Sequence, residues 1–266
     1  MESPIVTLTT DWGYHDFFAG IVKGKLYSYI PNVRVVDITH GIEPFQRGKA
    51  IFVVKNACMG FPKGTIHIID IDASQTMEHP FVVVEHKEQY YICTDNGLPQ
   101  AVFGDANGRA VLIDLFQESS FHTFAASNLF CKVAALLAQG TSLAEIGPVV
   151  DQFTPYTPAI PTYDKTSLRL YVTYVDTYGN ADLNITYERF EELRQGRRFE
   201  MFVREAVLKK ISYSYLDVPA GGRGRELILL TVSATGCLQV AMRESSAEQF
   251  LGLQSAESII VKFYEK

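Results

Sequence analysis

Three predicted strands in the first half of the sequence each deliver an aspartate at or near their carboxyl ends, and this pattern constrains the fold more than any other feature. The first strand, 5–10, stops at Asp11, the second carries Asp37, and the third ends at Asp70. Helical spacing follows the first two strands, and this alternation is typical of an α/β domain with parallel strands. Open sheets of that kind bind ligands at the carboxyl edge of the strands. The sequence therefore predicts a shared pocket at this edge.

Asp11 and Asp16 have two possible roles. Asp11 lies where its oxygens can accept hydrogen bonds from a sugar diol or chelate a cation, while capping a turn and a helix would account for both residues without any ligand. Asp95 and Asn96 precede Gly97 in a turn signal that could also contact a ribose or a base. Three strand ends of one kind favour the ligand-binding role.

The whole chain divides into two predicted domains joined by a linker. Residues 1–153 read as an α/β domain with a central, mainly parallel sheet, and residues 154–166 as a proline-rich, extended linker. Residues 167–266 read as an all-β barrel domain. In the first domain we expect helices up to 29, at 46–59 and at 129–139. Further strands are expected at 81–85 and 90–93, paired around a polar turn, and at 110–115. In the second we expect strands at 168–175, 211–215, 227–233, 237–242 and 258–263, with 188–198 as the one helix.

Composition and charge limit the classes of binding partner that the protein is expected to have. The formal charge is −6 and no basic cluster occurs, which argues against nucleic acid and anionic membranes and favours a small-molecule partner. No leader and no apolar run near 18 residues occurs, so we expect a cytoplasmic protein. The chain has four cysteines, Cys58, Cys93, Cys131 and Cys237, whose spacing fits no zinc signature. They are expected to be reduced and buried, and no metal site is expected.

A set of short motifs occurs in a fixed order along the chain: Thr9-Thr10-Asp11-Trp12-Gly13 with Asp16 and Gly24, Asp37-Ile38-Thr39-His40, 62–67, Asp95-Asn96-Gly97-Leu98, Asp176-Thr177-Tyr178-Gly179-Asn180, 213–219 and 236–241 with 251–253. Together these motifs resemble the S-adenosylmethionine hydroxide adenosyltransferases, which are relatives of the fluorinase and chlorinase enzymes. The resemblance runs nearly end to end, and the order and spacing of the motifs are specific.

The resemblance implies an α/β domain followed by a β-barrel, a homotrimer, and S-adenosylmethionine bound between subunits. By position, Asp11 would accept from the two ribose hydroxyls, and Phe45 stands where halogenases place a tryptophan that packs on the ligand. Asp176 would face the methionine ammonium. Tyr178 and Asn180 would face the adenine, although a plain turn would account for the same residues.

The family's chemistry is attack of a nucleophile on ribose C5′ with methionine as the leaving group. No cofactor is expected, since the sulfonium already leaves readily and positioning supplies the rest. In the hydrolases an Asp-Arg-His group activates water, and Asp70 matches its aspartate. No arginine occurs between Arg47 and Arg109, however, and Ala125 stands in place of the histidine.

Other side chains could replace the missing members, among them Asp72, His79, His122 and Ser127. The segment 233–235 also departs from the family pattern that holds the methionine carboxylate. Three functions follow from these observations. The chain cleaves S-adenosylmethionine to adenosine and L-methionine, or it binds an adenosyl ligand without turnover as a sensor or sequestering protein, or it transfers the adenosyl group to another nucleophile.

Overall fold

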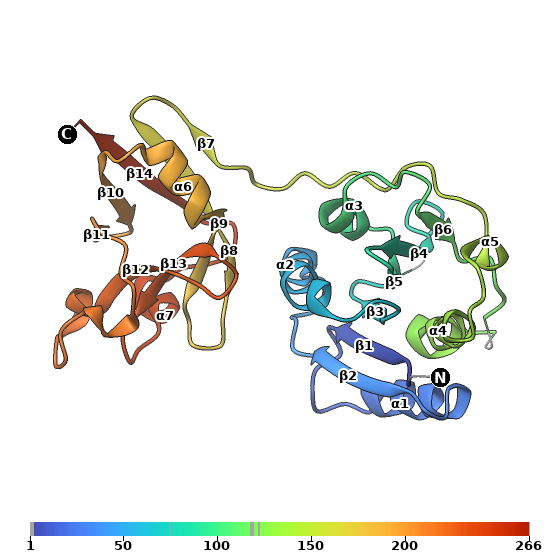
Figure 1. Cartoon of the computed structure of the whole chain (residues 1–266). Coiled ribbons are helices and arrows are strands. Elements are labelled where there is room, and N and C mark those ends of the chain that lie inside the picture. Colours follow the sequence, from blue (N-terminus) through green and yellow to red (C-terminus); the bar gives the residue numbers. More distant parts are fainter. Residues whose placement is uncertain (1–2, 75, 118–119, 122, 266) are drawn as a thin grey trace. The chain divides into compact units, whose positions relative to one another are not determined.

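The chain forms two compact units, Met1–Thr157 and Pro158–Lys266, in a computed structural model (Figure 1). The structure describes residues 3–74, 76–117, 120–121 and 123–265. The division lies within the proline-rich segment 154–166. Each unit has its own hydrophobic core and is described by itself.

A six-stranded sheet with the order β2-β1-β3-β5-β4-β6 forms the centre of the first unit. The four strands β2, β1, β3 and β5 run parallel, whereas β4 pairs antiparallel with both β5 and β6. The prediction of a mainly parallel sheet therefore holds only in part, because a two-residue turn between β4 and β5 permits a hairpin but no parallel crossover. The strands are β1 (Ile5–Thr10), β2 (Arg34–Thr39), β3 (Ile66–Asp70), β4 (Phe81–His86), β5 (Gln89–Thr94) and β6 (Ala110–Leu112).

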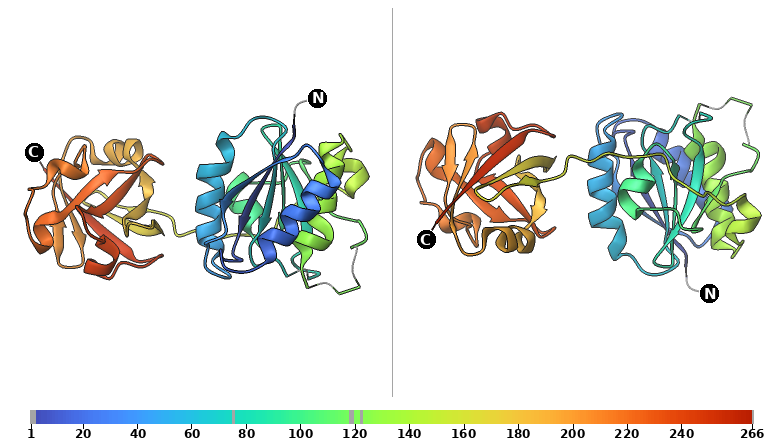
Figure 2. Two further views of the ribbon diagram at one scale, coloured as in Figure 1. Left: turned by 90° about the horizontal axis from the view of Figure 1, so that it is seen from below. Right: turned by 90° about the horizontal axis from the view of Figure 1, so that it is seen from above.

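Helices cover both faces of this sheet, as Figures 1 and 2 show. Val6 and Leu8 of β1 pack with α1 and α4 on one face, whereas Ile69 at the end of β3 packs with α2 and α3 on the other. This alternation follows from the two-residue side-chain period of a strand. The helices are α1 (Phe18–Tyr29), α2 (Arg47–Ala57), α3 (Leu98–Phe103), α4 (Cys131–Ala138) and α5 (Leu143–Ile146), with a 3₁₀ turn at Cys58–Gly60 and a π-helical turn at Ala126–Phe130.

The second unit is a nearly closed antiparallel barrel, as predicted. Its strands follow the order β11-β10-β14-β8-β9-β13-β12, and β7 pairs with β8 outside this path. Ile211, just after β11, forms a bridge with Leu230 of β12, which brings the two ends of the path together. The strands are β7 (Thr162–Tyr163), β8 (Ser167–Val175), β9 (Ala181–Thr186), β10 (Arg198–Val203), β11 (Ala206–Leu208), β12 (Ile228–Val232), β13 (Cys237–Met242) and β14 (Ser258–Tyr264).

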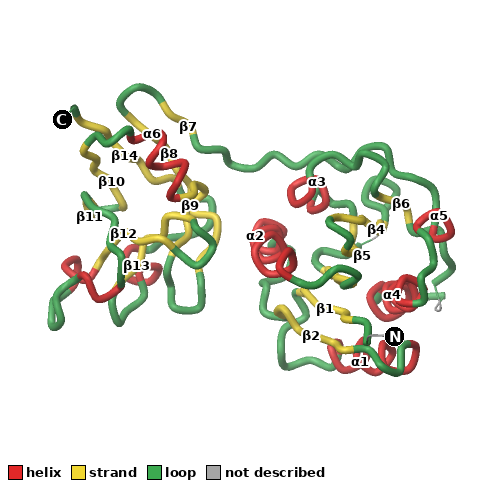
Figure 3. Tube along the Cα trace, in the orientation of Figure 1, coloured by secondary structure: helices red, strands yellow, loops and turns green. Residues whose placement is uncertain are grey.

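Several predicted elements of this unit were wrong in detail. The expected strand 211–215 is an isolated bridge followed by a 3₁₀ turn, Tyr215–Asp217, in which the Ser214 and Asp217 side chains form a capping box. The expected helix 188–198 is α6 (Tyr187–Arg194) and is followed by β10, and α7 (Ala247–Leu251) is a second helix (Figure 3). A further 3₁₀ turn spans Gly224–Leu227.

The turn between β8 and β9 docks on the start of α7. Gly179 has a φ of 78°, and its carbonyl accepts a hydrogen bond from the backbone N–H of Glu248 at 2.8 Å. A Cβ atom at Gly179 would overlap the hydroxyl of Ser246, whereas a Cβ at Gly236 would meet nothing. Gly236 has a similar φ of 80° and so provides a matched control.

We predict that Gly179→Ala lowers the free energy of unfolding more than Gly236→Ala does. The left-handed backbone costs about 1–2 kcal/mol for any residue with a Cβ, so both variants lose that amount. The overlap with Ser246 adds about 1–3 kcal/mol at Gly179 alone. Urea unfolding of both variants measures the difference, and equal losses would contradict the close packing of this turn.

Candidate functional site

The carboxyl ends of β1 and β3 lie side by side and bring two carboxylates together. The register of the parallel pair places Thr10 opposite Asp70, so Asp11 follows directly beside the end of β3. This arrangement is the one expected for neighbouring parallel strands that end in aspartates. Asp11 and Asp70 therefore form the centre of the candidate site.

Asp70 is a buried carboxyl group with one oxygen fixed and one oxygen free. Only 6% of the residue is exposed, and its Oδ2 atom accepts a hydrogen bond from the indole Nε1 of Trp12 at 2.7 Å. Oδ1 is buried and has no hydrogen-bond partner among the residues that the structure describes. The pKa of Asp70 is raised to about 7, chiefly by burial; the hydrogen bond from Trp12 opposes this rise, and the charge of Asp11 adds to it. The free oxygen can therefore take up a proton near neutral pH.

Asp11 is held by the backbone of two neighbouring loops. Its Oδ2 atom accepts the N–H of Phe45 at 3.2 Å and, over a longer distance of 3.4 Å, the N–H of Asp72. No hydrogen bond from a described residue reaches its Oδ1 atom. The ring of Phe45 is mostly exposed, which leaves it available to pack on a ligand. The carboxylate thus keeps acceptor positions for two hydroxyl groups.

Trp12 is in turn supported by His40. The two rings are stacked with centroids 5.6 Å apart, and the ring of Phe124 meets Trp12 edge-on. Nδ1 of His40 lies 2.7 Å from the hydroxyl of Thr10, and Nε2 lies 3.2 Å from Oδ1 of Asp37. Asp37 also accepts a hydrogen bond from Nζ of Lys23 at 2.5 Å, so its carboxylate pairs with Lys23 and His40 and not with Asp11 or Asp70.

Asp95 and Asn96 bind other parts of the protein in this structure. Both oxygens of Asp95 accept the N–H of Thr154 at 3.0 Å, and burial raises the pKa of its carboxyl. The side-chain amide of Asn96 donates to the carbonyls of Ile71 and Asp72 at 3.2 and 3.4 Å. These contacts join the loops after β3 and β5, and the ligand-binding role of the two residues stays a prediction.

The remaining residues predicted for this region are more scattered. Asp16 is exposed, and α1 begins without a side-chain cap, so Asp16 does not cap that helix. Nδ1 of His79 lies 3.1 Å from the carbonyl of Asp95, and Ser127 is buried in the π-helical turn. His122 lies outside the described residues.

In the second unit, Asp176 lies at the start of a turn, and its side chain accepts hydrogen bonds from residues later in the same turn. Its Oδ1 atom accepts the N–H groups of Tyr178 and Asn180, both at 2.9 Å, and Oδ2 accepts the Asn180 side-chain amide at 3.0 Å. Tyr178 is 80% exposed. The three residues therefore form one unit, which fits either a binding turn or a plain turn.

Asp182 is a buried carboxyl group in the second unit that sequence reasoning missed. Only 3% of it is exposed, and burial raises its pKa to about 6, opposed by hydrogen bonds from Ser233 and Gln239. The charge of Asp176 raises the pKa as well. No motif marks this position, because it lies inside the run of strand β9.

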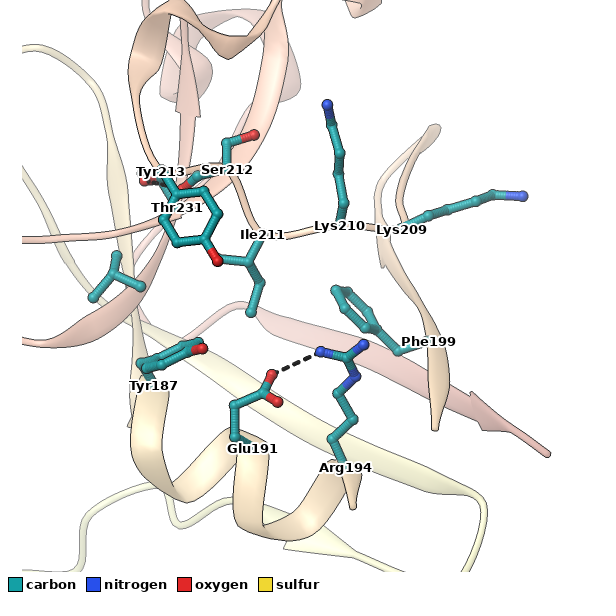
Figure 4. A pocket seen from close by; sticks show the side chains of 11 residues that line it. Tyr187, Glu191, Arg194, Phe199, Lys209, Lys210, Ile211, Ser212, Tyr213 and Thr231 are labelled. Carbon is teal, nitrogen blue, oxygen red and sulfur yellow. Dashed lines mark hydrogen bonds and ion pairs between the residues drawn. The ribbon is translucent and has the colours of Figure 1, made fainter. Parts of the chain in front are cut away.

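A separate groove of about 500 Å³ lies on the wall of the barrel (Figure 4). The Glu191–Arg194 ion pair, at 2.8 Å, lies beside Phe199, and the Arg194 guanidinium is 5.2 Å from the centroid of that ring. No residue predicted for the site lines this groove. No helix in the described part of the chain is long and apolar enough to cross a membrane. In the same part of the chain, no three His, Cys, Asp or Glu side chains are arranged to hold a metal ion.

Comparison with known proteins decides the family. The model of the S-adenosylmethionine hydroxide adenosyltransferase N-terminal domain matches residues 6–147, and that of the C-terminal domain matches residues 170–260. The chain belongs to the S-adenosylmethionine hydroxide adenosyltransferase family. The two matches correspond to the α/β unit and the barrel.

The alignments with similar proteins cover nearly the whole chain. A protein of Salinispora tropica named (R)-S-adenosyl-L-methionine hydrolase is 25% identical, covering 97% of this chain and 98% of its own. One of Methanocaldococcus jannaschii with the same name is 24% identical, covering 96% of this chain and 94% of its own. The crystal structure of a conserved protein from Thermotoga maritima matches with a TM-score of 0.83 at 25% identity, covering 97% and 99%. The Thermotoga maritima structure therefore agrees with this chain in fold over nearly the whole length of both chains.

Two residues of the site were missed although they lie in recognised segments. Trp12 follows Asp11 directly and is the only tryptophan of the chain, yet only the structure shows its bond to Asp70. Arg47 lies at the start of α2 and forms an ion pair with Asp72 at 3.6 Å. The sequence feature that could have identified Arg47 as a site residue is its position two residues after Phe45.

We predict that Asp70 makes the protein less stable as the pH rises. A carboxyl whose pKa is raised in the folded state contributes stability that is complete below its ordinary pKa of 3.8 and is lost as the pH rises through about 7. The Asp70→Asn variant lacks this titrating group. Between pH 5 and pH 8 the free energy of unfolding of the variant should therefore fall less than that of the wild type, by on the order of 1–3 kcal/mol. Urea unfolding at both values measures this.

The matched control for this experiment is Asp105→Asn, because Asp105 is an exposed aspartate outside the site. Asp182→Asn should change the pH dependence in the same direction as Asp70→Asn, since its pKa is also raised. A wild-type slope retained in Asp70→Asn would show that Asp70 is ionised at the same pH in the folded and unfolded chains.

Proposed function

We propose that this protein hydrolyses S-adenosylmethionine at ribose C5′ and releases adenosine and L-methionine. Membership of the hydroxide adenosyltransferase family supports this, as do the names of its relatives. The observation that carries the proposal is the buried Asp70 beside Asp11, with one oxygen fixed by Trp12 and one oxygen free. This pair provides a base and a diol acceptor at neighbouring strand ends.

The reaction needs one proton acceptor and accurate positioning. An oxygen of water attacks C5′ while the C5′–sulfur bond breaks, and its electron pair stays on the sulfur as the neutral thioether of methionine. One proton of the water passes to the free oxygen of Asp70 and then to solvent. Because the sulfonium leaves as a neutral group, no acid is required on the leaving side.

The pKa of Asp70 suits this task. A carboxylate of ordinary pKa is a weak base, whereas one near 7 is matched to neutral pH and still partly ionised. A positive charge close by would ease ionisation, and S-adenosylmethionine carries one on its sulfur. Substrate binding would therefore favour the carboxylate form that the reaction needs.

The charge distribution favours a cationic ligand in the first unit. Residues 1–157 contain 16 Asp and Glu residues against 10 Lys and Arg residues, whereas residues 158–266 contain 14 of each. The whole net charge of −6 thus belongs to the unit that contains Asp11 and Asp70. Such a field attracts a sulfonium ligand and raises its local concentration.

Binding without turnover is the less favoured function, because the base at Asp70 is retained even though no arginine or histidine stands at the family's positions. Adenine contacts from Tyr178 and Asn180 and an ammonium contact from Asp176 are part of the proposal. So are the homotrimer with sites between subunits and the cytoplasmic location.

We predict that Asp70→Asn reduces adenosine release on the order of 10²- to 10⁴-fold, because the amide cannot accept the proton. Chromatography of S-adenosylmethionine incubated with each protein measures this, and adenosine binding should stay near that of the wild type. In the wild type, kcat/KM should rise with pH and level off above about 7, where the pKa of Asp70 lies. Asp105→Asn is the control, and a normal rate in Asp70→Asn would refute the role of Asp70.

We predict that Asp11→Ala weakens adenosine binding by roughly 1.5–3 kcal/mol, the value of hydrogen bonds to a charged group. Calorimetric titration with adenosine measures this change. Asp105→Ala should bind adenosine like the wild type. Unchanged affinity for adenosine in Asp11→Ala would refute the proposal that Asp11 binds the ribose hydroxyls.

A further inference from the structure

Two residues in left-handed backbone conformations surround Asp11. Phe45 has a φ of 67° and Asp72 a φ of 48°, and the N–H groups of both point to Oδ2 of Asp11. Residues with a Cβ adopt this conformation at a cost, so the surrounding structure has to hold them there. Asp72 lies at the start of the loop after β3, where no strand pairing restrains it.

Arg47 is the side chain that forms an ion pair with Asp72. Its Nε atom lies 3.6 Å from Oδ2 of Asp72, and its Nη1 atom donates to the carbonyl of Asn96 at 2.5 Å. The amide of Asn96 donates back to the carbonyls of Ile71 and Asp72. The first residue of α2 thereby connects the loop after β3 with the turn after β5.

No other Lys or Arg in the described part of the chain forms an ion pair with Asp11, Asp70, Asp72 or Asp95. The side chains of Arg47 and Asp72 are 42% and 31% exposed, so water screens their attraction but does not abolish it. The left-handed backbone of Asp72 costs more free energy than a partly exposed ion pair supplies, so the ion pair offsets part of that cost.

We propose that the Arg47–Asp72 pair is a positioning device for the recognition of a cis-diol. It holds the N–H of Asp72 against Oδ2 of Asp11, which occupies that oxygen and directs Oδ1 toward the two hydroxyls of a nucleoside ribose. The inference rests on the proposed function, since the ribose is the diol in question. Arg47 acts through Asp72 and Asp11 and is a positioning residue.

The test compares two ligands that differ only in the diol. Adenosine and 2′,3′-dideoxyadenosine are titrated into the full-length protein, with the fluorescence of Trp12 as the signal, since it is the only tryptophan and lies beside Asp11. The wild type is expected to prefer adenosine. Arg47→Gln is expected to reduce this preference about 2- to 5-fold, the scale of a partly exposed ion pair, and to leave dideoxyadenosine binding unchanged.

Two further variants make the readout specific. Arg47→Lys keeps the charge and should retain part of the preference. In Arg47→Gln combined with Asp72→Gly, the preference should recover, because glycine adopts the left-handed backbone without being held. Lys49→Gln is the matched control on the same helix, since Lys49 pairs with Glu43 and not with the site.

A second measurement needs no ligand. Hydrogen exchange of the backbone amides at 71–74 should be faster in Arg47→Gln than in the wild type and in Lys49→Gln. An unchanged adenosine preference in Arg47→Gln, an equal loss for both ligands, no preference in the wild type, or unchanged exchange would each overturn the proposal.

The proposed function fails separately. Wild-type protein that prefers adenosine in the expected way but forms no adenosine from S-adenosylmethionine would refute the hydrolysis and keep the role of Arg47. Turnover with an unchanged preference in Arg47→Gln would refute the role of Arg47 and keep the hydrolysis.

Discussion

The parallel pairing of β1 with β3 is the constraint on which the site depends. Its register sets Thr10 opposite Asp70 and therefore places Asp11 beside a second carboxylate at the same sheet edge. Asp70 is buried, and among the described residues its carboxyl accepts a hydrogen bond from the indole of Trp12. Burying a carboxyl in this way is unfavourable unless it is neutral or paired, so the fold itself raises the pKa of Asp70.

This unfavourable burial is what makes the edge chemically useful. A group whose pKa is near 7 exchanges protons at neutral pH, and a free oxygen gives a water molecule a place to bind. Asp11, in contrast, receives backbone N–H groups and keeps its role as an acceptor. Two chemically identical side chains thus differ in environment because one contacts the indole of Trp12 and the other contacts the backbone of two loops.

The sequence predicts this edge because strand endings are local features. Asp11, Asp37 and Asp70 follow β-branched runs, and the barrel was expected from short strands between turns. What it could not supply are contacts between distant side chains, such as Trp12 with Asp70, and the pairing of Arg47 with Asp72 across two loops. The pairing of β4 with β5 was expected from the polar turn between them, and the structure shows it as an antiparallel hairpin. The antiparallel pairing of β4 with β6 joins segments far apart in the sequence and was not expected.

The most direct test of the account is where the oxygen of water goes. Purified protein is incubated with S-adenosylmethionine in water enriched in heavy oxygen, and both products are analysed by mass spectrometry. We predict heavy oxygen in the 5′-hydroxyl of adenosine and none in methionine, since water attacks C5′ and the sulfur leaves with its electrons. No adenosine, or adenosine without the label, would contradict the hydrolysis.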